Sequence, residues 1–251
     1  MAKIVQLSDC HLFKDKSKTG FNNINPYQSL QLLLDKVEQL NPDGVLVTGD
    51  ISGDDSEQSY QHFLTLMAQF NLSNKFKVIA GNHDQSNAFN KLLANLDLAK
   101  SQPWQIDNWF LHGIDTRHQD TLGRVCHKDL ENLKDKLQNN LDNFHLIACH
   151  HHPLASGGWM DKHQWLNRDD FVNAVTTLPQ VKLVIYGHIH HDSHHKILAC
   201  DFHSSPSTCW QFASQADFAI SDAMPGFKLY QLHNNGSFDS TTIRLQQEQF
   251  K

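Results

Sequence analysis

Side chains that can ligate metal ions follow five separate apolar stretches of the chain. These groups are Asp9-Cys10-His11, Gly49-Asp50, Gly81-Asn82-His83-Asp84, His150-His151-His152 and Gly187-His188-Ile189-His190. A single Asp-x-His or His-x-His is weak evidence for a metal site, and Gly-Asp after a strand is usually only a turn. Five such groups in succession are improbable as turns alone, so together they predict a metal centre.

The number of candidate ligands indicates two ions rather than one. Seven side chains are candidates: Asp9, His11, Asp50, Asn82, His150, His188 and His190. Seven donors exceed the four that tetrahedral zinc needs, whereas a bridging carboxylate suits a pair of ions about 3.5–4 Å apart. Such pairs activate water for hydrolysis. Because asparagine and mixed carboxylate ligands suit open sites, a purely structural metal site is disfavoured.

Strands that alternate with helices must bring these groups together. Apolar runs predict strands at 3–7, 45–48, 77–80, 104–111, 144–149 and 181–186, and a hairpin at Asn234-Asn235-Gly236 between 229–232 and 241–245. Apolar spacing predicts helices from Pro26 to Leu40, over 56–70, along Leu130, Leu133, Leu137 and Leu141, and over 169–177. This alternation indicates an α/β fold with mostly parallel strands, and two facing sheets with outer helices fit it. We expect one domain over 1–251.

The carboxyl ends of parallel strands form the ligand crevice of an open α/β sheet, so the five groups converge at one edge if these strands are parallel neighbours. In an extended chain, residues two apart lie on one face. This spacing would pair Asp9 with His11, and His188 with His190, while Cys10 faces the other way.

Composition excludes several classes of protein. The 251 residues include 21 Lys and Arg against 27 Asp and Glu, a net charge of −6, so we expect no nucleic-acid partner. No apolar run approaches the roughly 20 residues of a membrane span, and MAKIVQLSD does not read as a signal peptide. Five cysteines without a CxxC pair favour reduced thiols in the cytoplasm. A monomer and a homodimer both remain open.

In order, the five groups resemble the signature D-x-H, GD, GNH(D/E), H and GHxH of the calcineurin-like metallophosphoesterase family. A narrower resemblance is to its bacterial 3',5'-cyclic AMP phosphodiesterases (class III). It rests on SDCHLF (8–13), YQHF (60–63), CHHHPL (149–154), GHIH (187–190), PSTC (206–209) and QF (211–212). The resemblance implies an αββα sandwich of two mixed β-sheets flanked by helices. It also implies two divalent metal ions per chain, Fe²⁺ or Mn²⁺ first, with Zn²⁺, Co²⁺ or Mg²⁺ as alternatives.

The resemblance also assigns roles. It implies that one ion is held by Asp9, His11, Asp50 and His190, and the other by Asp50, Asn82, His150 and His188, with Asp50 bridging. Within the triple histidine it selects His150, although chemistry alone does not separate His150 from His151 or His152. His83 is implied to lie beside the phosphate as a catalytic residue, together with Asp50 and Asn82. Substrate contacts are expected from His11, Asp50, Asn82, His83 and His190.

The function implied is hydrolysis of 3',5'-cyclic AMP to 5'-AMP by attack of a metal-bound hydroxide on phosphorus. The cyclic nucleotide and AMP are then the partners, with neither nucleic acid nor membrane. Alternatives on the same centre are a broad-specificity phosphodiesterase, a nucleotide-pyrophosphate hydrolase and a phosphoprotein phosphatase. A silent nucleotide-binding sensor is a further alternative, which the complete ligand set disfavours.

Other residues carry open interpretations. The Cys10 thiol fits the core better than a metal. Four histidines lie near enough to the groups to contact substrate: His191, His194, His195 and His203. The segment 206–209 could shape a nucleotide pocket or be a strand-start turn. Trp159, Trp165 and Trp210 could stack a base, although buried packing is the commoner role of tryptophan.

Overall fold

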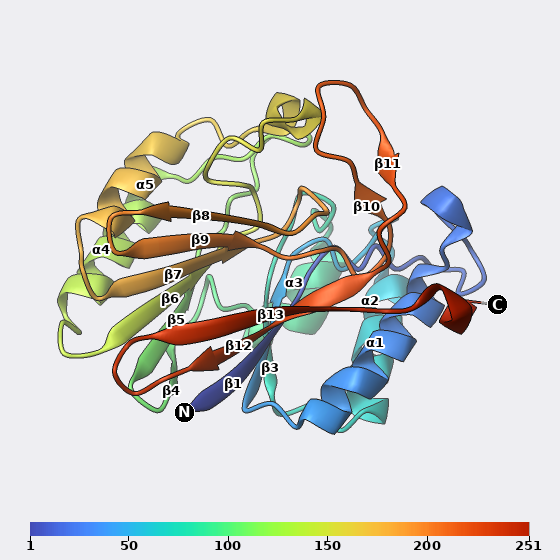
Figure 1. Cartoon of the computed structure of the whole chain (residues 1–251), viewed down its shortest axis with the longest axis horizontal. Helices are drawn as coiled ribbons and strands as arrows, with labels where there is room; N and C mark the ends of the chain where they lie inside the picture. The colour runs from blue at the N-terminus through green and yellow to red at the C-terminus, as the bar shows by residue number, and fades with distance from the viewer. Residues whose placement is uncertain (251) are drawn as a thin grey trace.

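The computed structural model describes residues 1–250 and contains two facing β-sheets with helices on their outer surfaces (Figure 1). The first sheet has the order β13-β12-β1-β2-β3. Its strands are β1 (Ala2–Leu7), β2 (Gly44–Thr48), β3 (Phe76–Ile79), β12 (Gly226–Leu232) and β13 (Phe238–Arg244). Strands β1, β2 and β3 are parallel, whereas β12 and β13 run antiparallel to their neighbours.

The second sheet has the order β4-β5-β6-β7-β9-β8. Its strands are β4 (Trp104–Ile106), β5 (Trp109–Gly113), β6 (Phe144–Ala148), β7 (Val181–Tyr186), β8 (Ser193–Ile197) and β9 (Cys200–Ser204). Only the edge strands β4 and β8 are antiparallel to their neighbours. A short ribbon joins β10 (Gln211–Phe212) to β11 (Ile220–Ser221).

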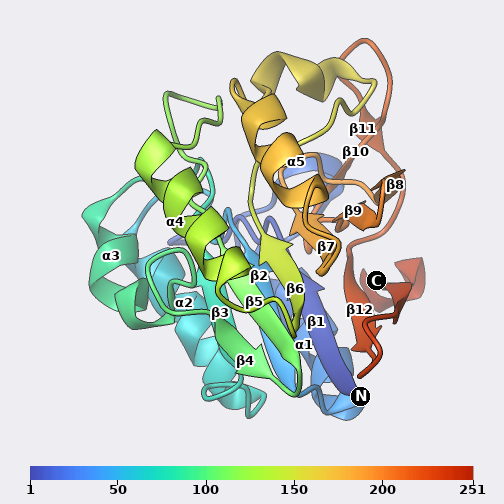
Figure 2. The same ribbon diagram turned by 90° about the vertical axis from the view of Figure 1, so that its left-hand side faces the viewer.

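Helices cover the outer face of each sheet. Those packed on the first sheet are α1 (Pro26–Leu40), α2 (Glu57–Gln69) and α3 (Asn87–Leu93). The helices α4 (His127–Gln138) and α5 (Arg168–Thr176) cover the second sheet (Figure 2). Four 3₁₀ segments complete the described elements: η1 (Phe21–Asn23), η2 (Ala94–Leu96), η3 (Trp159–His163) and η4 (Gln247–Phe250). The prediction of an αββα sandwich of two mixed sheets is confirmed.

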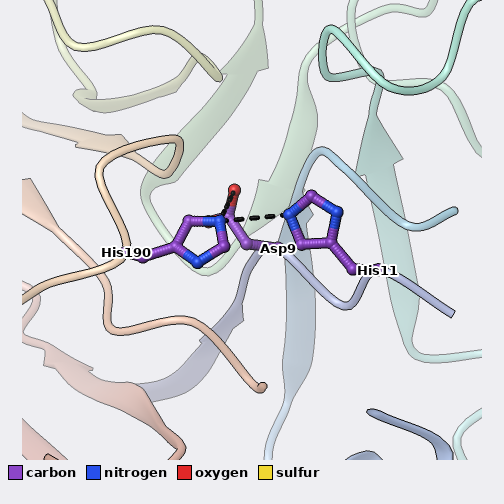
Figure 3. Close-up of side chains that lie close together, drawn as sticks. All are labelled: Asp9, His11 and His190. Carbon is purple, nitrogen blue, oxygen red and sulfur yellow. Dashed lines mark hydrogen bonds and ion pairs between the residues drawn. The ribbon is translucent and has the colours of Figure 1, made fainter. Parts of the chain in front are cut away.

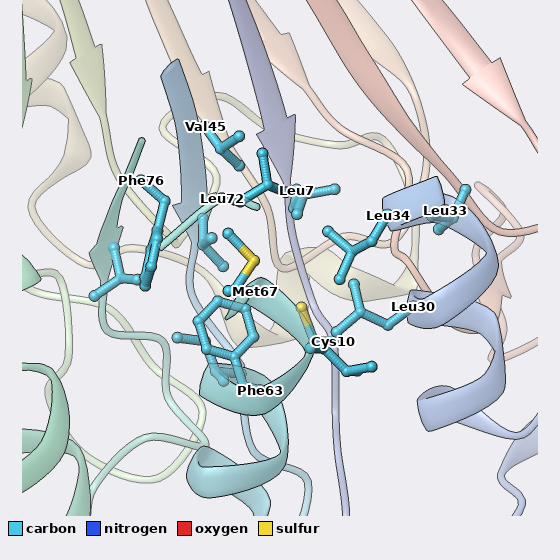
Figure 4. Packing of buried hydrophobic residues seen from close by; sticks show 14 of the residues in the cluster. Leu7, Cys10, Leu30, Leu33, Leu34, Val45, Phe63, Met67, Leu72 and Phe76 are labelled. Carbon is cyan, nitrogen blue, oxygen red and sulfur yellow. The ribbon is translucent and has the colours of Figure 1, made fainter. Parts of the chain in front are cut away.

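Apolar packing fixes the two sheets against each other. Side chains that fill the space between them include Ile4, Leu46, Ile79, Trp109, Leu146 and Ile185. Burying each such side chain contributes about 1.5–3 kcal/mol. A second cluster lies between the first sheet and its helices and contains Cys10, next to Leu30 and Met67 (Figure 4). The prediction that the Cys10 thiol belongs to the core is therefore confirmed.

Two local predictions are wrong. The segment 104–111 is not one strand but the hairpin β4–β5, because Asp107 adopts a left-handed φ of 51° and turns the chain. Leu141 does not continue the buried face of α4: the helix ends at Gln138, and Leu141 is 60% exposed. Among residues 1–250, the structure contains no helix with the length and apolar content needed to cross a membrane.

Candidate metal centre

The five predicted groups meet where the carboxyl ends of strands from the two sheets come together. The loops after β1, β2 and β3 carry Asp9, Asp50 and Asn82, and those after β6 and β7 carry His150 and His188. The five strands are not all neighbours, because three belong to the first sheet and two to the second, so the groups converge from two sheets and not along one edge. All seven candidate ligands are nevertheless buried at this seam.

The backbone that presents the ligands is left-handed, not extended. Positive φ angles between 45° and 70° occur at Asp9, His11, Asp50, His188 and His190. The expected extended geometry is therefore wrong. Asp9 and His11 still offer donor atoms to one cluster, whereas His188 and His190 join different clusters. A left-handed φ at a non-glycine residue costs on the order of 1–3 kcal/mol and persists only where surrounding contacts enforce it. Such contacts include the bonds from the peptide N–H groups of Asp9 and His11 to the loop after β2.

One cluster of donor atoms joins the ends of β1 and β7 (Figure 3). The Nε2 atoms of His11 and His190 are 3.1 Å apart. His190 Nε2 also lies 3.4 Å from Asp9 Oδ1. Ligands about 2.0–2.2 Å from one ion are about 3–3.6 Å from each other, so these three groups have the separations of a shared coordination shell.

A second cluster joins Asp50 to His150 and His188. His150 Nε2 lies 3.3 Å from Asp50 Oδ2 and 3.0 Å from Asn82 Oδ1. The same Oδ2 atom is 3.7 Å from His11 Nε2, which belongs to the first cluster. Asp50 therefore lies between the two groups of donors, as a bridging ligand would.

Hydrogen bonds to backbone carbonyls orient the imidazole rings. His150 Nδ1 donates to the Thr48 carbonyl at 2.8 Å, and His190 Nδ1 donates to the Trp210 carbonyl at 2.9 Å. Both bonds leave Nε2 with its lone pair for a cation. His188 has the opposite arrangement: its Nε2 donates to the His163 carbonyl at 3.1 Å, so Nδ1 is the nitrogen available to a cation.

The charges in the site also suit cations. Burial opposes ionisation of Asp9 and Asp50, yet nearby imidazoles, His190 and His150 respectively, lower the pKa of each carboxyl below its usual value. Burial lowers the pKa of His11 to about 3, so its ring is neutral at pH 7. Although burial opposes it, the Asp50 carboxylate raises the pKa of His150 to about 9, so that ring must give up a proton where it binds a cation. Two carboxylates and the neutral forms of the imidazoles make a donor set that fits a pair of divalent ions.

The structure separates the three consecutive histidines. His150 contacts Asp50 and Asn82 as described, whereas His151 Nδ1 bonds to the Thr116 hydroxyl at 2.7 Å. His152 Nε2 lies 3.4 Å from Asp161. Both neighbours pack beside His188, with ring centroids 4.6 Å and 5.6 Å away. Only His150 of the three thus joins the donor clusters.

Asp84 is a buried residue that holds two of the site's loops together, a role that sequence reasoning missed. Its buried carboxylate accepts bonds from the peptide N–H groups of Gly81, Ile51 and Ser52 and from the Tyr60 hydroxyl. It thereby joins the loop that carries Asp50 to the loop that carries Asn82. The Asp in GNHD was a visible signal, but its partners are not contiguous in sequence.

A cavity of about 330 Å³ opens beside the donor clusters. Its aromatic wall includes Trp159, Trp210 and Phe212. The Phe212 ring stacks on His190 at 4.3 Å, and the Trp210 ring stacks on His11 at 5.3 Å. Trp165 does not reach this cavity and packs against Phe171 instead.

The remaining candidates divide between cavity and scaffold. His83 lines the cavity, is exposed, and donates its peptide N–H to Asp50 Oδ1 at 2.8 Å. The segment 206–209 is buried behind the β1 loop, where Ser207 Oγ donates to the Asp9 carbonyl. Four histidines considered as substrate contacts do not line the cavity: His191, His194, His195 and His203.

Comparison with known proteins agrees with this geometry. The family model described as calcineurin-like phosphoesterase matches residues 2–192. A 3',5'-cyclic-nucleotide phosphodiesterase of Nostoc sp. is 30% identical over 247 residues, covering 96% of this chain and 92% of the relative. The 3',5'-cyclic adenosine monophosphate phosphodiesterase CpdA of Haemophilus influenzae is 29% identical over 261 residues, covering 99% of this chain and 92% of the relative.

Among solved structures, a dimetal phosphatase from Danio rerio superposes with a TM-score of 0.71. The match covers 97% of this chain and 98% of the other, at 11% sequence identity. At that identity the likeness supports the fold alone.

Asp50→Asn tests whether one carboxylate serves both donor clusters. We expect metal content to fall below two ions per chain and turnover to fall by more than the roughly 10- to 100-fold typical of an outer-shell loss. Metal analysis and kinetics on one preparation check this. Asp55→Asn is the matched control, because Asp55 lies on the same loop at a φ of 53° that asparagine tolerates. Full metal content and activity in Asp50→Asn would rule out the bridging position.

His150→Ala and His151→Ala test the separation within the triple histidine. His150→Ala should lose metal and activity together, because its imidazole contacts Asp50 and Asn82. His151→Ala should lower activity about 10- to 100-fold, as expected for a group that supports a ligand. Metal analysis with circular dichroism distinguishes ligand loss from unfolding. Greater metal loss in His151→Ala would contradict the arrangement.

Proposed function

The chain belongs to the calcineurin-like phosphoesterase family, and we propose that it is a metal-dependent phosphodiesterase that hydrolyses 3',5'-cyclic AMP to 5'-AMP. The observation that carries the proposal is the pairing of two donor clusters with an aromatic-walled cavity. The Nostoc and Haemophilus relatives, which are named as phosphodiesterases of 3',5'-cyclic nucleotides, support this substrate.

In this proposal Asp9, His11, Asp50 and His190 hold one divalent ion. Asp50, Asn82, His150 and His188 hold the second, and Fe²⁺ and Mn²⁺ are the expected metals. When bound, two such ions neutralise phosphate charge and lower the pKa of water, which makes a nucleophile available near neutral pH. Without cations, the ionised carboxylates of Asp9 and Asp50 would repel a phosphodiester anion. Activity should therefore depend strictly on metal.

Hydrolysis adds the oxygen of water to phosphorus and breaks the bond from phosphorus to the 3' oxygen. The 3' oxygen leaves as an alkoxide and needs a proton. We assign that proton to the imidazole of His83, which lines the cavity and is exposed to solvent. The ring lies 4.9 Å from that of His11, and its backbone is anchored to Asp50. His11, His190 and Asn82 line the same floor and complete the proposed contacts to phosphate.

The cavity walls favour a nucleotide over a simple phosphoester. Trp159 packs edge-on against Phe212, with ring centroids 4.9 Å apart, and both aromatic rings line the cavity beside the donor clusters. Stacking of a base on an aromatic ring is worth about 1–3 kcal/mol. Thr121 and His163 also line the cavity, bonded to each other at 2.6 Å, and offer polar groups to a ribose. A volume of about 330 Å³ falls within the range of small-molecule sites.

A substrate panel on one metal-analysed sample tests the proposed function. We expect kcat/KM for 3',5'-cyclic AMP to exceed that for the base-free cyclic ribose phosphate by about 5- to 150-fold, the equivalent of one stacking contact. It should also exceed the values for 2',3'-cyclic AMP and a bis-aryl phosphate.

Equal rates across the panel would indicate a broad-specificity phosphodiesterase instead. Faster turnover of a nucleotide pyrophosphate or a phosphoprotein would assign the centre to those substrates. Binding of cyclic AMP without turnover, in protein shown to hold both metals, would indicate a sensor.

His83→Ala tests the proton donor. Both metals should stay bound, because His83 is placed beside the donor clusters and outside the proposed ligand set, while turnover of cyclic AMP should fall about 10²- to 10⁴-fold. The loss should be smaller for a nitrophenyl ester, whose leaving oxygen needs little protonation. His118→Ala, at an exposed loop histidine, is the control and should change neither rate. Loss of metal, or equal losses on both substrates, would contradict the role of proton donor.

A further inference from the structure

A second cavity lies between the β8–β9 edge of the second sheet and the β12–β13 hairpin of the first. Its volume is about 670 Å³, and none of its lining residues lines the cavity at the metal centre. Three of its side chains are metal-competent: His194, Asp201 and His203. Figure 1 shows β8 and β9 side by side along one edge of their sheet.

Strand register brings these three side chains together. Asp201 and His203 are two residues apart on β9 and so project from the same face. His194 on β8 pairs directly opposite His203, with ring centroids 4.5 Å apart. His194 Nε2 lies 2.7 Å from Asp201 Oδ1. One donor atom from each residue falls within 4.8 Å of the other two.

His203 supplies an independent reason to expect a ligand. The residue is only 4% exposed, yet neither ring nitrogen has a hydrogen-bond partner within residues 1–250. An unpaired buried polar group costs about 1–3 kcal/mol. Burial, together with the charge of Lys228, lowers the pKa of His203 to about 3. The ring is therefore neutral at pH 7 and has a lone pair available.

We propose that His194, Asp201 and His203 bind a divalent transition-metal ion of the Zn²⁺ type at a site separate from the metal centre. Two imidazoles and one carboxylate are a common zinc donor set, with the fourth position left for water or an anion. Imidazole donors also favour Zn²⁺ over Mg²⁺ or Mn²⁺, which prefer oxygen. The ion would join the edge strand β8 to β9.

Nearby lysines limit the affinity without blocking the site. Lys196 Nζ lies 3.1 Å from Asp201 Oδ2, but its side chain is 60% exposed and can turn to solvent. Lys228 is already paired with Asp192 at 2.6 Å. Lys182 also lines the cavity. The positive surroundings weaken cation binding, so we expect this site to bind Zn²⁺ less tightly than a structural zinc finger does.

Residue-resolved labelling of histidine with diethyl pyrocarbonate tests the site on protein whose metal centre is already loaded. Zn²⁺ at ten times its Kd should reduce labelling of His194 about tenfold, because roughly one chain in eleven is then free. His195 is the internal control, since it is exposed on the same strand and faces the opposite side. Mg²⁺ should protect neither residue. Asp201→Asn should weaken the protection of His194.

Equilibrium dialysis with Zn²⁺ supplies the second measurement. His194→Gln should bind one equivalent fewer than wild type, whereas His195→Gln should bind the same amount. Both positions are exposed and outside the metal centre, so the fold and basal activity should persist. Equal Zn²⁺ binding by the two variants, or unchanged labelling of His194 with Zn²⁺, would overturn the proposal. Protection by inorganic phosphate alone would also overturn it and would identify an anion site formed by the lysines.

Discussion

Two buried carboxylates, Asp9 and Asp50, impose the constraint on which the rest of the structure depends. A carboxylate removed from water costs several kcal/mol unless charges and hydrogen bonds compensate it. Asp9 belongs to the first sheet but accepts the peptide N–H of His188 from the second, at 3.1 Å. Asp50 accepts the peptide N–H of His83. The loops therefore close around these carboxylates, and imidazoles supply partial compensation that a pair of cations would complete.

This closure explains the unusual backbone of the site. Five ligand-bearing residues have left-handed φ angles, at a cost of about 1–3 kcal/mol each. The cost is tolerable because the apolar layer between the sheets holds the strands rigidly on both sides of the seam. At position 49 only glycine fits, because a Cβ on Gly49 would lie 2.4 Å from His150 Nδ1. The loops that position the candidate ligands are thus also the loops that lower the stability of the fold.

Sequence reasoning identified the candidate ligands because each follows, within four residues, the end of a mostly apolar strand. It predicted two facing sheets but could not assign each strand to one of them, since strand order depends on long-range packing. The left-handed φ angles at Asp9 and His188 could not be predicted, because aspartate and histidine do not indicate a positive φ as glycine does. The partners of Asp84 are far apart in sequence. The group formed by His194 and His203 needs the β8–β9 register, although Asp201-x-His203 was readable as a motif.

The segment that follows β9 contacts both the aromatic cavity wall and the candidate metal ligands. Ser207 donates to the carbonyl of Asp9, and the Trp210 carbonyl orients His190. The rings of Trp210 and Phe212, on the same segment, stack on His11 and His190 and line the cavity. A change that reshaped the aromatic wall would also move the carbonyl that fixes the tautomer of His190. Because one short segment serves both purposes, the proposed base-binding wall and the proposed coordination shell cannot vary independently.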